Sequence, residues 1–390
     1  MVEFSLNEND QKILNEVRKE GLARRQYSRE YDDNKKDPPD ELPEAEKFDY
    51  IRDMMMERRN HKGACSSTVF SMLNSFQQHW GEPMLNRRYP RSGVGNVTLN
   101  TMGTAEQKEK WHDKLLAFAN TEPGCGSDSK AIETTAVLDG DEWVLNGEKI
   151  FITNGIKCDG AVVFATLDKS AGRGAIKAFV VLRGTPGFEL AKKEQKMGLR
   201  VSDTANYILK DCRIPRENLL GLDEGIKTGG GGFKGVMQTF NITRPGVAAI
   251  SVGEIMACHE LVEEALKQEG IRVNWETGHH SRSAVQQKLI DLEALLEATT
   301  LTVLRATWLM DKGRPNNVES SVCKAKGGNL AREGAQLAVE LLGALGITHD
   351  TLVEKLFRDA RVGDIYEGTG EIQRLVIARA ILNYSSKDLM

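Results

Sequence analysis

The sequence predicts an α+β protein in which a β-rich middle segment separates two helical ones. The 390 residues are enough for two or three domains, because a single hydrophobic core rarely serves more than about 250–300 residues. Residues 118–232 carry short runs typical of strands, whereas residues 1–117 and 233–390 carry longer runs typical of helices. We therefore expect an N-terminal helical domain (1–117), a central antiparallel β domain (118–232) and a C-terminal helical bundle (233–390).

The N-terminal segment is polar and contains strong charge runs such as REYDDNKKDPPDELPEAEK. We expect helices here, with a mobile connection around Pro38 and Pro39, because proline ends helices. The opening residues include acidic side chains and lack the apolar core of a signal peptide, so a cytoplasmic location is expected. No stretch approaches the roughly 18 apolar residues that a membrane span needs.

The middle segment combines strand-forming runs with turn signals. The pairs Asp139-Gly140 and Asn146-Gly147 are the tight turns expected in antiparallel hairpins, and Asn154-Gly155 ends the next strand. The run Gly229–Gly232 is the low-complexity element of the chain and is expected to be a flexible domain connector.

The C-terminal segment shows apolar residues at near-helical spacing. Val285, Leu289, Leu292, Leu296 and Val303 recur on one helical face. Further segments behave similarly, and short loops between them favour a helical bundle. In FNITRP, residues 240–245, the proline is expected in a first helical turn.

Composition excludes several function classes. A net charge of −4 and a pI near 6.1 do not indicate the basic surface that nucleic-acid-binding proteins carry. The six cysteines include no CxxC motif, and the seven histidines include no HExxH motif. Neither a metal site nor a disulfide framework is therefore expected, and a reducing cell compartment is the simpler interpretation. The chain has no GxSxG motif, no Walker loop and no GxGxxG motif after a strand. The sequence therefore gives no support for a serine hydrolase, a kinase or a nicotinamide-dependent enzyme.

Two segments of the middle domain could hold a flat heterocycle. The loop NTEPGCGSD, residues 120–128, places two glycines around Cys125, and such loops expose backbone N–H groups to ligands. The strand in GEKIFITNG, residues 147–155, points Phe151 and Thr153 to one side, because side chains alternate along a strand. A plain turn and ordinary core packing explain the same residues, so both interpretations stay open.

The segment GDIYEGTGEI, residues 363–372, sets Glu367 between an aromatic ring and a Gly-Thr-Gly turn. The glycines permit close backbone approach, and the helix that follows offers unpaired N–H groups. The turn is either only a helix entrance, or Glu367 faces something bound. Arg244 in FNITRP is a second charged candidate, with a solvent-exposed arginine as the ordinary alternative.

Five segments stand in order along the chain: TEPGCGSD, NGEKIFITNG, KMGLRVSDT, TRPGVAA and FRDARVGDIYEGTGEIQRLVIAR. Together they resemble the flavin-dependent acyl-CoA dehydrogenase family. The resemblance implies a helical domain, a β domain and a C-terminal four-helix bundle, in the order expected from the residues. It also implies FAD as cofactor, an acyl-CoA thioester as substrate, electron-transfer flavoprotein as electron acceptor, and a homotetramer.

The resemblance assigns roles by position. Glu367 matches the family's catalytic base, which removes the α-proton of the substrate while hydride leaves the β-carbon for flavin N5. The resemblance implies no metal ion. Thr243 stands where some branches of the family carry the base instead, and it is not a carboxylate. The implied FAD contacts are Phe118, Asn120, Thr121, Ser127, Phe151, Thr153, Glu340, Thr369 and Glu371, with Arg272 reaching from a neighbouring subunit. The implied substrate contacts are Ser127, Asn241, Arg244, Gly368 and Arg379.

Two other functions stay open at this point. A flavin monooxygenase can share the fold, but those relatives lack the glutamate, so Glu367 counts against it. The non-enzymatic alternative is a helical interaction protein that does not bind FAD. This alternative stays open because residues 1–117 match the family poorly. Because this N-terminal domain helps to wall the acyl pocket in the family, the preferred chain length is not specified. Linear, branched, cyclic, aryl-bearing and dicarboxylic acyl groups all stay open, as does a decarboxylation after oxidation.

Overall fold

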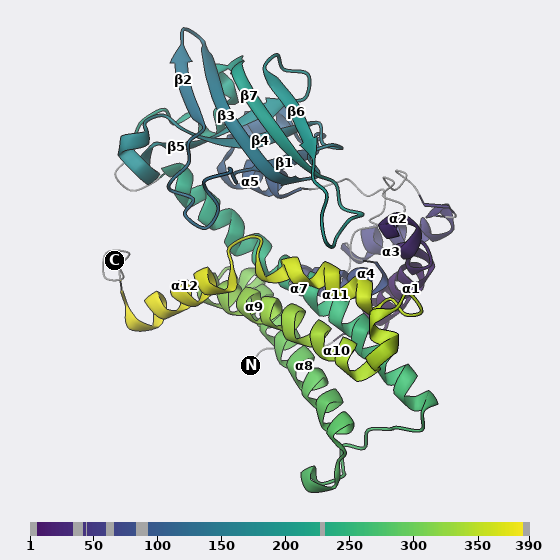
Figure 1. Cartoon of the computed structure of the whole chain (residues 1–390). Helices are drawn as coiled ribbons and strands as arrows, with labels where there is room; N and C mark the ends of the chain where they lie inside the picture. Colours follow the sequence, from purple (N-terminus) through teal and green to yellow (C-terminus); the bar gives the residue numbers. More distant parts are fainter. Residues whose placement is uncertain are drawn as a thin grey trace. The chain divides into compact units, whose positions relative to one another are not determined.

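The computed structural model describes residues 6–33, 42–43, 45–59, 66–82, 93–226 and 231–384. The chain divides into two compact units, and most of their elements are labelled in Figure 1. The helical unit comprises Met1–Arg87, Lys196–Val201 and Asn241–Met390, and the sheet unit comprises Arg88–Gln195 and Ser202–Phe240. The connection expected at Pro38 and Pro39 lies outside the described residues.

Among its described residues, the sheet unit contains seven strands in one sheet, with the order β1-β4-β2-β3-β7-β6 and with β5 paired to β4. Pairs β2–β3, β3–β7, β4–β5 and β6–β7 are antiparallel, which confirms the expected type of β domain, while β1–β4 and β2–β4 are parallel. The elements are β1 (Leu116–Ala119), β2 (Thr135–Asp139), β3 (Glu142–Thr153), β4 (Gly160–Thr166), β5 (Ile176–Leu182), β6 (Phe188–Lys193), β7 (Thr204–Pro215), α5 (Val94–Met102) and α6 (Ala105–Lys110).

Strand β4 is buried on both faces because its alternating side chains enter two separate clusters. Ala161 and Val163 pack with one cluster, which includes Trp143 of β3. Val162 and Phe164 pack on the other face. A strand covered on both faces has a continuous apolar sequence, and GAVVFAT has this character.

The two Asn/Asp-Gly pairs have different structures. Asp139-Gly140 forms the expected turn between β2 and β3, with Gly140 at φ +63°. The turn predicted at Asn146-Gly147 is wrong, because the pair lies inside β3 at a register shift against β7. A Cβ on Gly147 would lie 2.3 Å from the Thr134 hydroxyl oxygen, so the glycine permits close packing rather than a hairpin.

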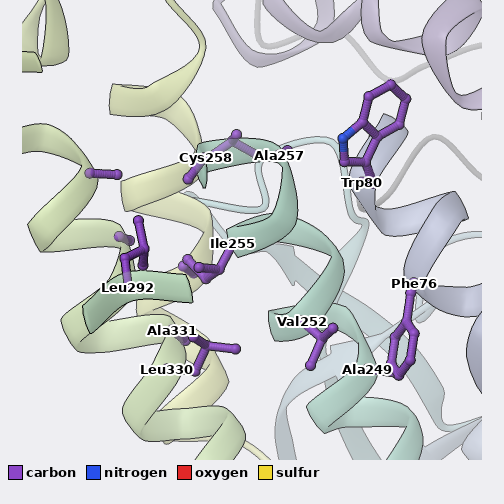
Figure 2. Close-up of a cluster of buried hydrophobic side chains, with 14 of the residues drawn as sticks. Phe76, Trp80, Ala249, Val252, Ile255, Ala257, Cys258, Leu292, Leu330 and Ala331 are labelled. Atoms are coloured by element: carbon purple, nitrogen blue, oxygen red, sulfur yellow. The ribbon is translucent and has the colours of Figure 1, made fainter. Parts of the chain in front are cut away.

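The helical unit has a core built by helices from both ends of the chain. Figure 2 shows Phe76 and Trp80 of α4, Val252 of α7 and Leu292 of α8 among its buried side chains. Its helices are α1 (Glu8–Arg25), α2 (Ser28–Asp33), α3 (Tyr50–Arg59), α4 (Ser67–Gly81), α8 (Ala284–Asp311), α9 (Asn317–Asn329), α10 (Ala335–Leu342), α11 (Val353–Ala360) and α12 (Gly370–Leu382), with most of α7 (Gly231–Gln268). A five-residue π-helical turn, Leu330–Gly334, joins α9 to α10.

Helix α7 is longer than the sequence indicated. It begins at Gly231, so Gly231 and Gly232 of the expected connector are helical, and Pro245 lies inside the helix rather than in its first turn. Proline leaves the carbonyl four residues earlier without its helical hydrogen bond. Here that carbonyl belongs to Asn241, and it accepts bonds from Asn316 Nδ2 (3.2 Å) and Ser320 Oγ (2.8 Å) of the α9 region.

One part of α7 also corrects the expectation about membrane spans. Among the described residues, Gly235–Gln268 is long and apolar enough to cross a membrane by length and composition. Its most apolar window is 67% buried within the protein, as in the core helix of a bundle.

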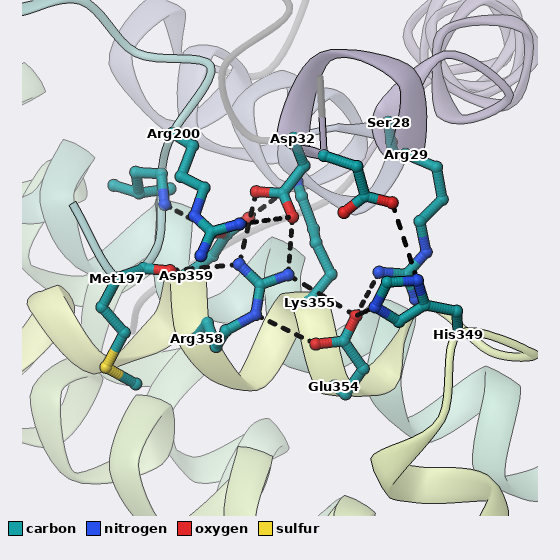
Figure 3. Close-up of polar contacts among 12 residues, drawn as sticks. Ser28, Arg29, Asp32, Met197, Arg200, His349, Glu354, Lys355, Arg358 and Asp359 are labelled. Atoms are coloured by element: carbon teal, nitrogen blue, oxygen red, sulfur yellow. Dashed lines mark hydrogen bonds and ion pairs between the residues drawn. The ribbon is translucent and has the colours of Figure 1, made fainter. Parts of the chain in front are cut away.

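Helix α11 joins distant segments of the helical unit through charged groups (Figure 3). Arg358 pairs with Asp32 of α2 at 2.6 Å and donates to the carbonyl of Met197 at 3.1 Å. The amide of Leu199 donates to Asp359 Oδ1 at 2.6 Å. These contacts hold the short segment 196–201 in the helical unit, although its neighbours in sequence belong to the sheet unit.

A second part of this network is a buried cluster of carboxylates around Lys355. Its ammonium group lies 2.7 Å from Glu82 and 2.7 Å from Asp359, and both carboxylates are buried. Glu254 of α7 faces the same cluster, is 1% exposed and has no hydrogen bond to its Oε1 among the described residues. Burial raises the pKa of Glu254 well above its ordinary value, with Asp359 and Glu82 adding to the rise and Lys355 opposing it.

Candidate active site

Glu367 occupies a strained turn just before α12 in the helical unit. Its φ is +52° and that of Gly368 is +92°. Thr369 is the N-cap of α12, and its hydroxyl accepts the Ile372 amide at 3.4 Å. A non-glycine residue in the left-handed region costs on the order of 1–3 kcal/mol, and such strain persists only where the surroundings enforce it.

The surroundings of Glu367 hold both its backbone and one carboxylate oxygen. The Thr243 hydroxyl donates to Glu367 Oε2 at 2.6 Å. Arg244 Nε donates to the Glu367 carbonyl at 3.4 Å, and Gln373 Nε2 donates to that carbonyl at 3.3 Å and to the Gly368 carbonyl at 3.1 Å. Among the described residues, Glu367 Oε1 has no hydrogen-bond partner, so one carboxylate oxygen is left for a ligand.

The electrostatic environment makes Glu367 a suitable proton acceptor. Burial raises the pKa of Glu367, while the Thr243 hydrogen bond and the positive charges of Arg244 and Lys324 work against the rise. A carboxyl whose pKa lies closer to neutral pH is a better general base than an ordinary one. The ordinary alternative for Arg244, a solvent-exposed side chain, is wrong, because the residue is 4% exposed.

Two residues near Glu367 were missed by sequence reasoning. Gln373 is fully buried on the first turns of α12, and its position four residues after the N-cap Thr369 was the available signal. Lys324 is fully buried on α9, and its Nζ has no hydrogen bond among the described residues. Burial lowers the pKa of Lys324 to about 8, opposed by Asp364 and Glu367. It lies in a run of small residues with no signal for a site.

The sheet unit carries an uncovered aromatic and hydroxyl face at the end of β3. Phe151 is 59% exposed and Thr153 is exposed, while Ile152 between them is buried. This alternation of exposure is what two residues on one side of a strand would show. Phe151 has φ +58° in a β-bulge, where Ile150 and Phe151 together oppose Asn206. An exposed ring beside a hydroxyl fits a flat heterocycle with polar edges.

The first residues of the loop at 120–128 pack against strand β3. The Ile150 amide donates to the Thr121 carbonyl at 2.9 Å, and the Asn120 side of the loop is buried. Ser127 is exposed, and Gly124 and Gly126 have no atom within 4 Å of an added Cβ, so this stretch of backbone is open to a ligand. Together the strand and loop fit the flavin that the resemblance implies.

Other predicted contacts have their own surroundings. Phe118 packs against Phe164 and Phe240, with ring centroids 5.0 and 5.5 Å apart. The Glu340 carboxylate forms an ion pair with the Lys288 ammonium group, at 3.1 Å. Arg272 is exposed in the loop after α7.

Distance separates Arg272 from the carboxylate within one chain. At about 1.5 Å per residue, α7 runs roughly 36 Å from Arg244 to its end at Gln268. Arg272 and Glu367 therefore belong to different ends of the helical unit. The Glu371 carboxylate is exposed on α12, and the Arg379 Nε is buried without a hydrogen bond among the described residues.

Metal chemistry has no visible ligand set in the part of the chain that the structure describes. No group of three or more His, Cys, Asp or Glu is arranged to hold an ion there. The five cysteines in this part are buried and free.

A helical bundle with one pre-set carboxylate, in a chain that also has a β unit with an uncovered aromatic face, is typical of a flavoprotein dehydrogenase. Two family models match the chain: acyl-CoA dehydrogenase, middle domain, over residues 117–212, and acyl-CoA dehydrogenase, C-terminal domain, over residues 230–382. The chain belongs to the acyl-CoA dehydrogenase family. It is accordingly an oxidoreductase that acts on acyl-CoA, which confirms the enzyme class expected from the sequence.

Individual relatives agree with this assignment. The protein of Mus musculus named short-chain specific acyl-CoA dehydrogenase, mitochondrial, is 42% identical over 286 residues, which are 72% of this chain and 67% of that protein. The structure of butyryl-CoA dehydrogenase from Megasphaera elsdenii matches with a TM-score of 0.80 and 29% identity, covering 97% of this chain and 100% of that one. A chain from the structure described as the electron transferring flavoprotein of Acidaminococcus fermentans matches with a TM-score of 0.80 and 31% identity, covering 98% and 100%. Because the two structural matches cover 98% and 97% of this chain, they include described helices of its N-terminal segment.

Proposed function

We propose that the enzyme oxidises a short, unbranched acyl-CoA to the enoyl-CoA, with Glu367 as the α-proton base. The observation that carries the proposal is the turn at residues 367–369. It holds the Glu367 backbone through two side chains and Oε2 through Thr243, while Oε1 has no partner among the described residues. A base needs this combination of fixed position and one open oxygen.

The chain's own groups would act in this way. Glu367 Oε1 accepts the α-proton of the thioester, and its burial favours the neutral acid that forms. Thr243 keeps the carboxylate oriented through Oε2, and Arg244 keeps the carbonyl of the same residue in place. When bound, FAD supplies the acceptor for the hydride that leaves the β-carbon.

The residues proposed to hold FAD are those with open surfaces on the sheet unit. Phe151 would pack on the ring system, Thr153 and Ser127 would offer hydroxyl groups to its polar edge, and the backbone around Gly124 and Gly126 would lie close to it. Thr369 caps α12 and would serve an anionic part of the cofactor from there.

The acyl chain length and the electron acceptor are proposed from the relatives. A short-chain specific enzyme and a butyryl-CoA dehydrogenase are both similar over most of their lengths, which supports a substrate near four carbons. The match to a chain from the Acidaminococcus fermentans structure supports electron-transfer flavoprotein as the acceptor.

We further propose that the enzyme is a homo-oligomer, with a tetramer as the expected size. The large apolar side chains Leu375, Ile381 and Leu382 of α12 are 46%, 71% and 52% exposed in the single chain. Arg272 follows the end of α7 that is far from Arg244, which supports its serving a cofactor near Glu367 from another copy. Light scattering coupled to gel filtration measures this directly, and a monomer with full turnover would contradict it.

Anaerobic bleaching of the bound flavin by a panel of acyl-CoAs tests the main proposal. Butyryl-CoA is expected to bleach the flavin fastest, with slower bleaching by octanoyl-, isovaleryl- and glutaryl-CoA. Crotonyl-CoA should appear in step with the loss of colour. Bleaching by none of the thioesters would contradict the dehydrogenase proposal, whereas fastest bleaching by glutaryl-CoA would contradict only the acyl group.

A further inference from the structure

Glu122 and Lys149 form a buried ion pair in the sheet unit that the proposed reaction does not use. Lys149 Nζ lies 2.6 Å from Glu122 Oε1, and the two side chains are 0% and 4% exposed. Glu122 lies in the loop at residues 120–128, and Lys149 lies on β3 two residues before Phe151. The pair therefore connects the two segments proposed to hold the flavin.

Both groups of the pair make further hydrogen bonds to the surrounding chain. Glu122 also accepts from the Glu133 amide at 2.6 Å and from the amide and hydroxyl of Thr134, and Lys149 Nζ also donates to the Asn120 carbonyl at 3.2 Å. Burial works to raise the pKa of Glu122, but Lys149 and the bonds from Thr134 and Glu133 outweigh it, so the carboxylate stays ionised. Burial lowers the pKa of Lys149 to about 8, with Glu122 opposing the fall. The 2.6 Å contact therefore joins an ionised carboxylate to an amine whose positive charge it favours.

A buried ion pair is a poor way to gain stability alone, because desolvation offsets most of its attraction. Such a pair can instead hold two segments in a defined geometry, because separating the partners leaves each buried charge without its compensating charge. Here the pair draws the Asn120 carbonyl onto Lys149, and the next residue of β3, Ile150, bonds the Thr121 carbonyl at 2.9 Å. The loop is thus docked on β3 at the two residues that precede Phe151.

The docking point is also the start of the β-bulge. Lys149 opposes Tyr207 in register, and the next registered residue is Ile152, opposite Ala205. The extra residue in this interval turns Phe151 outward, and the Phe151 amide donates to Asn206 Oδ1 at 3.2 Å. The side chain of Lys149 is thus fixed on the buried side where the strand changes its course.

We propose that the Glu122–Lys149 pair is a positioning device that sets the loop at residues 120–128 against the bulge of β3 and so pre-forms the flavin-binding face. The inference rests on the proposed function, because it assumes that FAD binds on this face. It assigns to Glu122 and Lys149 no contact with FAD. The pair acts through Asn120, Thr121 and Phe151.

The double variant Glu122→Gln/Lys149→Met tests the inference, because it removes both charges at similar volume and leaves no unpaired buried charge. Lys177→Met is the matched control, since Lys177 is a buried lysine of the same sheet that pairs with Asp223 at 3.5 Å. Three quantities are measured on the purified holoprotein: the FAD dissociation constant by dilution, the visible spectrum of the bound flavin, and hydrogen exchange of the Ile150 amide.

The double variant is expected to fold, to bind FAD at least tenfold more weakly, to shift the flavin spectrum and to exchange the Ile150 amide faster. The control should leave the FAD dissociation constant and the spectrum as in the wild type. A folded double variant with wild-type affinity and spectrum would overturn the inference. If the double variant does not fold, Lys149→Arg decides, since it keeps the charge but not the fit, and wild-type FAD affinity in that variant would overturn the inference. Failure of the wild type to bind FAD would instead overturn the proposed function.

Discussion

Replacing Glu367 by glutamine separates the base from its surroundings. Glutamine keeps the size of the side chain and an oxygen that accepts the Thr243 hydroxyl, which lies 2.6 Å from Oε2 in the structure. It also keeps the positive φ of +52° at no added backbone cost. The amide cannot accept a proton, so the change removes the proposed chemistry and little else.

The magnitude follows from the role of a general base. Such groups contribute typically ~10²–10⁴ in rate, and we expect flavin reduction to slow by at least that factor. In free energy this is roughly 3–5 kcal/mol of barrier, at 1.36 kcal/mol per tenfold. Unfolding free energy should change by less than about 1 kcal/mol, because the hydrogen bonds to the Glu367 carbonyl do not involve the carboxylate.

Anaerobic stopped-flow reduction with butyryl-CoA measures the rate, and thermal unfolding and FAD content check the fold. Glu263→Gln is the control, because Glu263 is a half-exposed carboxylate on α7 that pairs only with Lys267 among the described residues. Reduction of the Glu367→Gln variant at near wild-type rate would refute the assignment of the base. Lost stability with unchanged turnover per folded chain would instead show that the turn is only a helix entrance.

Three further predictions concern the same helical unit. Thr243→Val removes the hydroxyl that stabilises ionised Glu367, so the pKa of Glu367 should rise and the acid limb of the pH–rate profile should move to higher pH, whereas Thr243→Ser should leave it in place. Arg244→Ala should lower kcat about tenfold and raise KM, because it removes a long charge-assisted bond to the Glu367 carbonyl, and a change in KM alone would restrict Arg244 to CoA binding. Glu254→Gln should raise Tm by an amount that grows as the pH rises above about 5. The pKa of Glu254 is raised on folding, so its contribution to stability is full below the unfolded pKa near 4.5 and is lost as pH rises toward the folded pKa. A Tm difference independent of pH would contradict the last prediction.

Local sequence signals predicted the elements well where they depended on periodicity. The spacing of Val285, Leu289 and Leu292 predicted a helix, and α8 covers Ala284–Asp311. Signals carried by one or two residues were less secure. Asn146-Gly147 has the composition of a hairpin turn but lies at an irregularity inside β3, because a close neighbour, Thr134, requires a glycine there.

The position of Pro245 shows the same limit. A proline near a helix is ordinarily placed in its first turn, since it lacks an N–H to donate. Here Asn316 and Ser320 satisfy the carbonyl of Asn241, and the helix continues through the proline. The two donors lie about 75 residues further along the chain, so no local pattern contains this information.

The sequence by itself determined the order of helical and β segments and the carboxylate Glu367 in its glycine-flanked turn. These follow from periodicity and backbone preference, which act over a few residues. Only the tertiary structure decided which charged groups are buried and what they face. Arg244 lies against Glu367, which is 123 residues away, and Lys149 lies against Glu122, which is 27 residues away. Desolvation and ion pairing depend on packing between distant segments, so the environment of the base and the docking of the loop on β3 could be established only from the folded chain.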